Sequence, residues 1–354
     1  MIRWILSEDL PRSRILAGLL VVLMAFLLLA PYLSGGARVL NTAVTIAVFT
    51  LLAASFDLLI GYCGIVSFAH AMFYGIGAYG LAIASTRMGA GWDAVLTGGV
   101  LGILVAGVVA VLVALISLRV KAIFYTMTTL AVASAFGALV LRMTALTGGD
   151  DGLTFALPEG LSPARSYLGG ALDGTTVTYY LIIFIAVGLF LALLRLVNSR
   201  FGTVLKAIRE NEFRAEALGY STLRYRLAAN MIAAMMAAAA GVLMALWLRY
   251  VGPQTTVSFN VVLNVLLMCV IGGLGTLYGA AIGVVVFVVG ENYLQLLLAK
   301  LHPAVEGLPI LGDLITPERW LLIFGTVFVL AVYFFPTGVV GRLREIRLAK
   351  EQTR

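Results

Sequence analysis

Long apolar runs follow one another along this 354-residue chain, and short polar segments separate them. A run of about 20 apolar residues is long enough to cross the hydrocarbon core of a bilayer as a helix. The runs are continuous rather than alternating, which argues against a β-barrel. The pattern therefore predicts an all-α fold, a polytopic transmembrane helical bundle that forms a single domain over residues 1–354. The predicted spans number about ten: Ile15–Leu33, Val39–Ile60, Ile65–Ser85, Ala94–Leu118, Ala122–Leu141, Val177–Val197, Leu227–Leu248, Phe259–Gly273, Tyr278–Ala299 and Trp320–Phe335.

The first apolar run resembles a signal peptide, because Arg3, Arg12 and Arg14 precede it. It is long for a signal peptide, however, and many further spans follow it. We therefore expect a retained first helix.

Composition supports a membrane protein and argues against nucleic-acid binding. The chain is 62% hydrophobic and 12% charged, and a soluble protein of this size could not bury so much apolar surface. The net charge of +7 comes from basic residues beside the spans, which is typical of the cytoplasmic edge of a membrane.

Charge also predicts the orientation of the chain. The loop between Arg195 and Arg226 is strongly basic, as are the short turn with Arg119 and Lys121 and the tail at 337–354. If these face the cytoplasm, both termini are cytoplasmic. The segment 142–176 is then extracytoplasmic, and it is acidic, with Asp150, Asp151, Glu159 and Asp173 against Arg142 and Arg165.

The cytoplasmic segment 199–220 has the pattern of an amphipathic helix. Thr203 is a candidate cap at its start, and Gly219 stands where helices often end in a left-handed residue. Leu205, Ile208, Ala215 and Leu218 fall on one side, and Lys206, Glu210, Phe213 and Arg214 fall on the other, with Glu210 and Arg214 spaced for an ion pair. Such a helix either lies on lipid or docks another protein.

Two turns between spans share the pattern IGxxG, at Ile60–Gly64 and Ile271–Gly275. Glycines here indicate either close helix packing or broken, re-entrant helices. The second alternative is typical of transporters with an internal, inverted repeat.

Few ionisable groups interrupt the apolar runs: Asp57, His70 and Glu291. His70 either lines a polar pathway or, as buried polar groups usually do, bonds locally. Asp57 is near the end of its span and within reach of water, whereas Glu291 faces a partner subunit or a water-filled cavity. Cys63 and Cys269 are expected to be core residues without a disulfide or metal role. The sequence contains no recognisable catalytic motif, so we assign no catalytic residue and no metal ligand.

Four stretches, in this order, resemble the permease subunits of branched-chain amino acid ABC importers, specifically the longer of the two homologous permease types. They are GYCGIVSFAHAMFYGIGAYG at 61–80, LTGGDDGL at 146–153, RFGTVLKAIRENEFRAEALGY at 200–220 and VIGGLGTLYGAAIG at 270–283. The resemblance implies a multi-pass protein of a bacterial cytoplasmic (inner) membrane, in contact with membrane lipid. It implies no enzyme activity and no cofactor in this chain, because ATP and Mg²⁺ bind a partner.

The resemblance also implies partners and site residues. The partners are a second, shorter permease, two cytoplasmic ATPases and a periplasmic or lipid-anchored substrate-binding protein. The segment 199–220 becomes the loop that couples to the ATPase, through Lys206, Arg209, Glu210, Asn211, Phe213, Arg214, Ala217 and Gly219. The translocation pathway is assigned to Gly64, Ser67, His70, Gly75 and Gly77, and binding-protein docking to Thr147, Gly148, Gly149, Asp150 and Asp151.

Three alternatives stay open at this point. A permease of the same family for urea or amides has the same motifs. An ion-coupled secondary transporter of small polar solutes would use Asp57 and Glu291 as coupling sites. An intramembrane enzyme would need a catalytic constellation near one membrane face.

Overall fold

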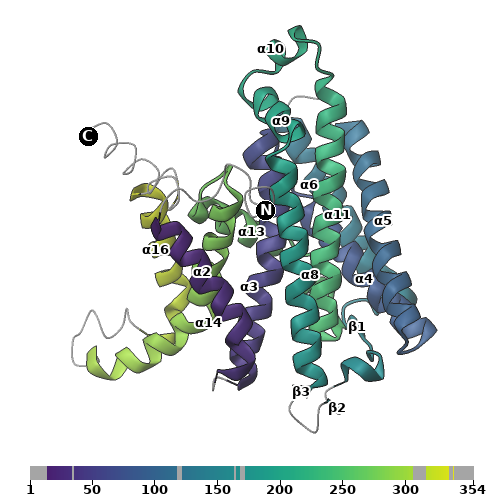
Figure 1. Ribbon diagram of the computed structural model, residues 1–354. Helices are drawn as coiled ribbons and strands as arrows, with labels where there is room; N and C mark the ends of the chain where they lie inside the picture. The colour runs from purple at the N-terminus through teal and green to yellow at the C-terminus, as the bar shows by residue number, and fades with distance from the viewer. Residues whose placement is uncertain are drawn as a thin grey trace.

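The computed structural model describes residues 14–33, 36–117, 122–162, 165–167, 172–305, 316–334 and 338. A helix lies at each of the ten predicted spans (Figure 1). Among the described residues, seven helical spans are long and apolar enough to cross a membrane, and Leu16–Tyr32 is a shorter apolar helix. The predicted all-α polytopic bundle is therefore confirmed, while the number of crossings stays a prediction. The long helices are α2 (Arg14–Leu29), α3 (Gly36–Asp57), α4 (His70–Met88), α5 (Trp92–Ser117), α6 (Ala122–Arg142), α8 (Gly174–Val197), α11 (Thr222–Leu248), α13 (Phe259–Gly272), α14 (Leu277–Val305) and α16 (Trp320–Phe334).

Short elements connect these helices. They are η1 (Ala30–Tyr32), η2 (Leu58–Cys63), α7 (Thr144–Thr147), β1 (Leu153–Thr154), η3 (Glu159–Leu161), β2 (Ser166–Tyr167), β3 (Leu172–Asp173), α9 (Arg200–Glu210), α10 (Glu212–Ala217), β4 (Tyr250–Val251), α12 (Pro253–Thr256) and η5 (Pro317–Arg319). Strand β2 pairs antiparallel with β3, and β1 pairs antiparallel with β4, with Leu153 opposite Val251. The second pairing fastens the predicted extracytoplasmic segment to the end of α11.

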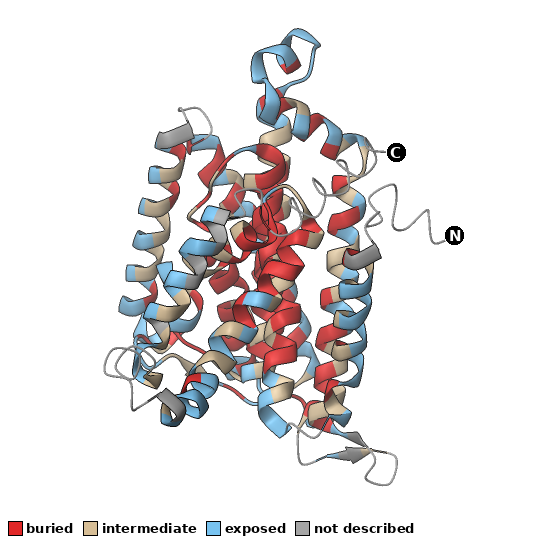
Figure 2. Cartoon of the chain, turned by 90° about the vertical axis from the view of Figure 1, so that its left-hand side faces the viewer, coloured by how far each residue is buried: buried red, intermediate tan, exposed pale blue. Residues whose placement is uncertain are grey.

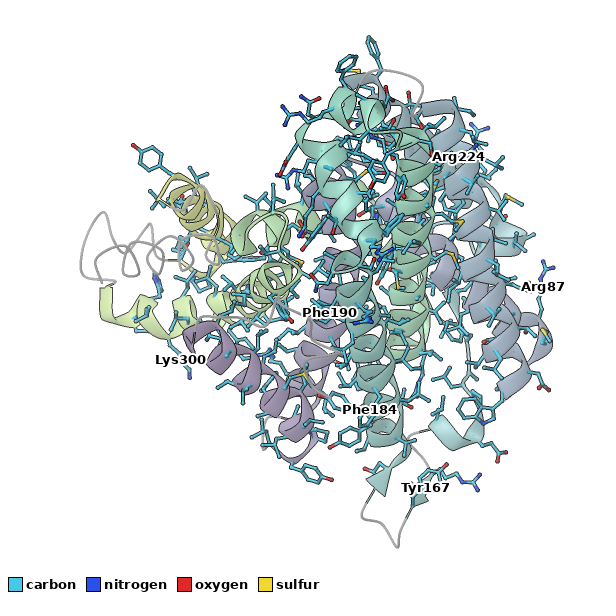
Figure 3. All side chains as sticks on the ribbon, turned by 45° about the horizontal axis from the view of Figure 1, so that its top comes forward. Arg87, Tyr167, Phe184, Phe190, Arg224 and Lys300 are labelled. Atoms are coloured by element: carbon cyan, nitrogen blue, oxygen red, sulfur yellow. The ribbon has the colours of Figure 1, made fainter. Side chains whose placement is uncertain are left out.

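The predicted cytoplasmic and extracytoplasmic segments lie at opposite ends of the bundle. Helices α9 and α10 project from one end, and β2 and β3 lie at the other (Figure 1). Arg224 and Tyr167 mark the same two ends in the view with all side chains (Figure 3). This separation is what the orientation predicted from charge requires.

The core of the bundle lies along α3, α4 and α11, and both α3 and α4 pack against α11. The buried residues gather in the middle of the bundle (Figure 2). Cys63 and Cys269 are buried there, as predicted. Helices α5 and α6 cover one side and leave many apolar side chains exposed, among them Leu101, Leu112 and Met127. Exposed apolar side chains on a long helix are what contact with lipid or with another membrane helix requires.

Glycines let the core helices approach closely. A Cβ atom at Gly77 on α4 would collide with the carbonyl group of Ala238 on α11, and one at Gly75 would collide with the side chain of Val257. Gly80 on α4 likewise faces Gly98 and Gly102 on α5. These three glycines therefore allow close helix contacts.

A buried polar residue also joins three helices. Asn230 on α11 donates from its side-chain nitrogen to the carbonyl of Ala110 on α5 at 2.9 Å, and its side-chain oxygen accepts from Tyr125 on α6 at 3.1 Å. In lipid, such interhelical hydrogen bonds contribute to helix association.

Some predictions lie outside the described residues. These are the basic turn with Arg119 and Lys121, the N-terminal residues Arg3 and Arg12, and the basic tail at 337–354 apart from Gly338.

Gly77→Ala should destabilise the protein, because the added methyl group meets backbone atoms rather than a flexible side chain. Overpacking of this kind typically costs about 1–3 kcal/mol. Gly137→Ala on α6 is the matched control, since a Cβ there meets no atom within 4 Å. Thermal unfolding of the purified protein in detergent should show a lower midpoint for Gly77→Ala alone. Equal midpoints for the two variants would contradict this packing account.

Candidate coupling and translocation sites

The segment 199–220 forms two helices rather than the single helix predicted. The hydroxyl of Ser199 accepts from the amide of Phe201 at 3.2 Å and caps α9, so the expected cap at Thr203 is wrong. Asn211 has an extended backbone, which ends α9, and its side chain accepts from the amide of Arg214 at 2.9 Å and caps α10. Gly219 follows α10 with a left-handed φ of +89°, as predicted.

The expected Glu210–Arg214 ion pair is also wrong. The break at Asn211 puts the two residues on different helices, so they are no longer one helical turn apart. In the described part of the chain, the acid that pairs here is Glu212, whose Oε1 lies 2.6 Å from Nη1 of Arg226 on α11. Glu216 accepts from the hydroxyl of Thr222 at 2.8 Å. These two contacts hold α10 against the start of α11.

One face of α9 and α10 packs on the protein itself. Leu205, Ile208 and Ala215 are buried, and Phe201 stacks on Tyr225 with ring centroids 5.6 Å apart. The alternative of a helix that lies on lipid through Leu205 and Ile208 is therefore wrong. Leu218, predicted on the same face, is instead 71% exposed.

The far end of the segment presents apolar side chains outward. Phe213 is 82% exposed and does not fold back onto the protein. Leu218 and Tyr220 are also exposed beside it. We call these three residues the apolar tip. The other residues assigned to coupling, namely Lys206, Arg209, Glu210, Asn211, Arg214, Ala217 and Gly219, are exposed as well.

The two IGxxG turns meet under α9. Asp57 is fully buried, and its Oδ1 accepts from the amide of Gly275 in the second turn at 2.8 Å. Nη1 of Arg209 on α9 donates to the carbonyl of Gly61 in the first turn. We call this group of four residues the glycine junction. The expectation that Asp57 reaches water is wrong, because the residue is fully buried and its carboxyl group bonds the second turn.

Glycine is required at this junction. A Cβ at Gly61 would collide with the nitrogen of Gly275 and with the Asp57 carboxyl group. Gly275 has a φ of +80°, and a Cβ on it would lie 3.1 Å from Nη1 of Arg209. Beside the junction, the Nζ of Lys206 lies 5.1 Å from the centroid of the Tyr62 ring, a cation–π contact that adds a second link from α9 to η2.

The residues assigned to the translocation pathway lie between packed helices. Ser67 and His70 are buried, and Gly75 and Gly77 contact their neighbours as described above. His70 bonds locally, with Nε2 2.8 Å from Oγ of Ser55 and its ring edge-on to Phe56. Gly64 is exposed beside Arg209. Their role in the pathway stays a prediction.

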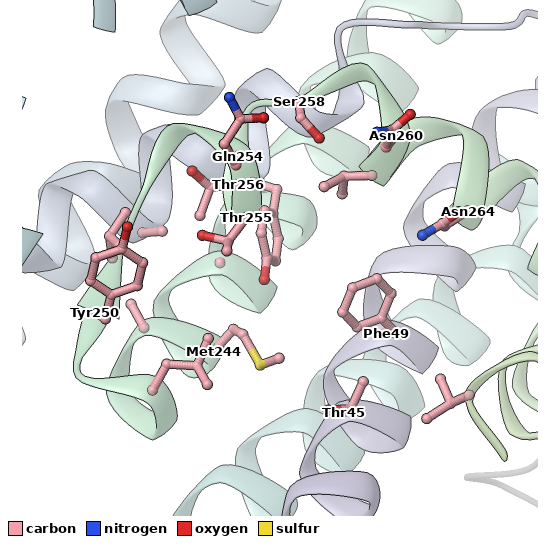
Figure 4. Close-up of a pocket in the computed structure, with 18 of the residues that line it drawn as sticks. Thr45, Phe49, Met244, Tyr250, Gln254, Thr255, Thr256, Ser258, Asn260 and Asn264 are labelled. Carbon is pink, nitrogen blue, oxygen red and sulfur yellow. The ribbon is translucent and has the colours of Figure 1, made fainter. Parts of the chain in front are cut away.

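A cavity of about 290 Å³ lies between α3, α4, α11, α12–α13 and α14 (Figure 4). Phe49, Met244 and Val288 are among the apolar residues that line it. Its polar lining comes mainly from α12–α13, with Glu291 from α14. The polar residues around the cavity are Thr45, Tyr74, Tyr250, Gln254, Thr255, Thr256, Ser258, Asn260, Asn264 and Glu291.

Three of these cavity residues, Gln254, Asn260 and Asn264, were missed by the sequence analysis. They are neutral amides, whereas the candidates predicted inside the apolar runs were ionisable groups. The usable signal was the i, i+4 spacing of Asn260 and Asn264, which places two amides on one face of an apolar span.

The residues assigned to binding-protein docking divide into two groups. Thr147 is buried and donates to the carbonyl of Val140 at 2.6 Å, and Gly148 and Gly149 have φ values of +74° and +63° in the turn that follows. These three residues shape the turn. Asp150 and Asp151 are exposed on it.

The fold and these sites define a polytopic α-helical membrane protein with an exposed tip at one end and a partly polar cavity among its helices. The chain belongs to the family of permease components of branched-chain amino acid transport systems, whose family model matches residues 38–332.

Named relatives cover most of the chain. The high-affinity branched-chain amino acid transport system permease protein LivM of Salmonella typhimurium is 27% identical over 295 residues, which are 77% of this chain and 68% of the relative. A probable LivM of Methanocaldococcus jannaschii is 27% identical over 68% of each chain. The permease protein LivH of Escherichia coli is 26% identical over 83% of this chain and 91% of its own. No solved structure matches the chain.

Substitutions at Asp57 test the glycine junction. Asp57→Ala removes the acceptor for the buried amide of Gly275, and an unsatisfied buried donor costs about 1–3 kcal/mol. Asp57→Asn keeps an acceptor oxygen of the same geometry. Thermal unfolding in detergent should therefore show a larger loss for Asp57→Ala than for Asp57→Asn. If alanine is tolerated as well as asparagine, this hydrogen bond does not hold the two turns together.

Proposed function

We propose that this chain is a transmembrane permease subunit of an ATP-driven ABC importer for branched-chain amino acids. Its family, and the printed names of the relatives above, support this function. An importer of urea or amides is the second candidate. The apolar side of the cavity, with Phe49, Met244 and Val288, favours a substrate with an aliphatic side chain.

The proposal includes an assembly in a bacterial cytoplasmic membrane. LivM and LivH relatives both match this chain, which supports a second homologous permease as partner. Two cytoplasmic ATPases would bind ATP and Mg²⁺, and a periplasmic or lipid-anchored binding protein would deliver the substrate. In this arrangement the chain crosses the membrane about ten times, keeps both termini in the cytoplasm and has an internal inverted repeat.

The observation that carries the coupling role is the apolar tip. A group of neighbouring apolar side chains exposed on a polar surface is typical of an interaction site, and aromatic residues are enriched at interfaces. The tip stands at the end of the bundle that charge assigns to the cytoplasm, where an ATPase would be found. Its Phe213 has the size and exposure of an anchor for a partner's pocket.

At the opposite end, Asp150 and Asp151 would contact the binding protein. Both are exposed on a turn that Thr147, Gly148 and Gly149 hold in shape. We keep the docking role for the two acids and assign the other three residues a structural role within the turn.

The contacts of Asp57 argue against the alternative of an ion-coupled secondary transporter. That rival needs Asp57 and Glu291 as coupling sites, but Asp57 is engaged in the glycine junction. It would have to rely on Glu291 in the cavity.

Phe213→Ala combined with Glu210→Ala tests the proposed docking. Truncation of an aromatic anchor can cost about 2 kcal/mol or more of binding free energy. Because both side chains are exposed, the fold should not change. We expect the variant to insert in the membrane and bind its sister permease, and to lose both copurification of the ATPase and amino acid uptake.

Leu205→Ala with Ile208→Ala is the contrasting variant. These side chains are buried in the protein, so their truncation should lower the thermal stability of the variant. The protein that remains folded should still bind the ATPase. Full retention of the ATPase by the 210/213 variant would refute the coupling role.

A further inference from the structure

We propose that the cavity beside α12–α13 is the place where this permease holds its substrate during transport, and that it takes a zwitterionic amino acid with an aliphatic side chain. This inference rests on the proposed function and adds the site and the residues that contact the substrate.

Three amide side chains on α12–α13 have no function in the fold that the structure shows. The side chains of Gln254, Asn260 and Asn264 make no hydrogen bond within the described part of the chain, whereas Thr255 and Thr256 both donate to the carbonyl of Gly252 and hold the α12 turn. The three amides border the same cavity and lie across it from Phe49, Thr45 and Met244 (Figure 4).

The position of these polar side chains in membrane spans indicates what surrounds them. Asn260 and Asn264 belong to the apolar span Pro253–Gly272, and Glu291 belongs to Leu277–Pro303. A polar side chain at membrane depth is costly when it faces lipid, and it normally faces a water-filled cavity or a partner. The three residues line one cavity, so we infer that water and a polar solute occupy it.

The lining fits the chemistry of a neutral amino acid. Glu291 is the acidic residue of the lining, and its carboxyl oxygens can accept hydrogen bonds from an ammonium group. The side-chain amides of Gln254, Asn260 and Asn264 can donate to a carboxylate. Phe49, Met244 and Val288 then surround the aliphatic side chain. A volume of about 290 Å³ is at the lower end of small-molecule sites, which suits a ligand as small as a free amino acid.

The cavity is also placed for delivery from outside. Tyr250 and Val251 of β4 line it, and β4 pairs with β1 of the segment 142–176. That segment carries Asp150 and Asp151, to which we assign binding-protein docking. From α4 the cavity receives Tyr74 and Ala78 rather than the glycines and His70 to which the sequence analysis assigned the pathway.

The test uses the complete importer in liposomes, with sister permease, ATPases and binding protein, and leucine as the probe. Glu291→Gln and Asn264→Leu should each lower leucine uptake at least tenfold, while assembly and ATP hydrolysis stay within twofold of the wild type. Glu318→Gln and Asn292→Leu are the matched controls. Both replace exposed residues of the same types outside the cavity lining, and both should transport normally.

A second measurement covers the case in which a substitution impairs assembly. Asn264→Cys introduces a thiol into the cavity, whereas Cys63 and Cys269 are buried. In the assembled complex, leucine supplied with its binding protein should slow modification of this thiol by a small polar maleimide at least fivefold. Modification of Asn292→Cys should not change.

The outcomes separate the two proposals. Normal leucine uptake by both site variants, or no protection of the thiol at position 264, would overturn the cavity assignment and leave the proposed function intact. Absence of leucine uptake by the wild-type importer would overturn the proposed function and the ligand assigned here together.

Discussion

The architecture at one end of this bundle depends on the glycine junction, where two turns far apart in sequence come into backbone contact. Asp57, at the end of α3, accepts from the amide of Gly275 before α14, and Arg209 on α9 donates to the carbonyl of Gly61. The contact is possible because no side chain stands between the two backbones. Through it, α3, α13, α14 and α9 share one point of attachment.

This junction gives a physical route by which a partner at the apolar tip would act on the helices. The tip is linked to α11 by the Glu212–Arg226 ion pair, and α9 is linked to both turns by Arg209. A partner that moves α9 and α10 would therefore move the ends of α3 and α14, and both helices border the cavity. Transport driven by a partner requires two states of this kind, because a ligand or partner shifts an equilibrium only through different contacts in each state.

Much of the helical layout followed from hydrophobic patterning, because each long apolar run has to bury or satisfy its own backbone in lipid as a helix. Of the two alternatives that the IGxxG motif left open, close packing is the one that Gly61 and Gly275 bear out. The prediction of a single helix over 199–220 was wrong because of one residue, Asn211. Its side chain accepts a hydrogen bond from a backbone amide and caps a second helix, and this competes with continuation of the first helix.

The sites were harder to predict because they depend on contacts between distant segments. Asp57 looked close to water in the sequence, and only the approach of residue 275 shows why it is buried. The amides of the cavity were not predicted because they carry no charge, and the candidates within the spans were ionisable groups. The exposure of Phe213, by contrast, followed from its place among charged residues in the sequence.

The most direct test of the account is the coupling of ATP hydrolysis to uptake in Arg209→Ala, measured in the reconstituted importer. Arg224→Ala, an exposed arginine at the same end of the bundle, is the control. If Arg209 transmits movement from α9 to the two glycine turns, its variant should keep the ATPase bound and active and lose most of its uptake per ATP hydrolysed. An unchanged ratio of uptake to hydrolysis in Arg209→Ala would show that Arg209 does not transmit movement from α9 to the two glycine turns.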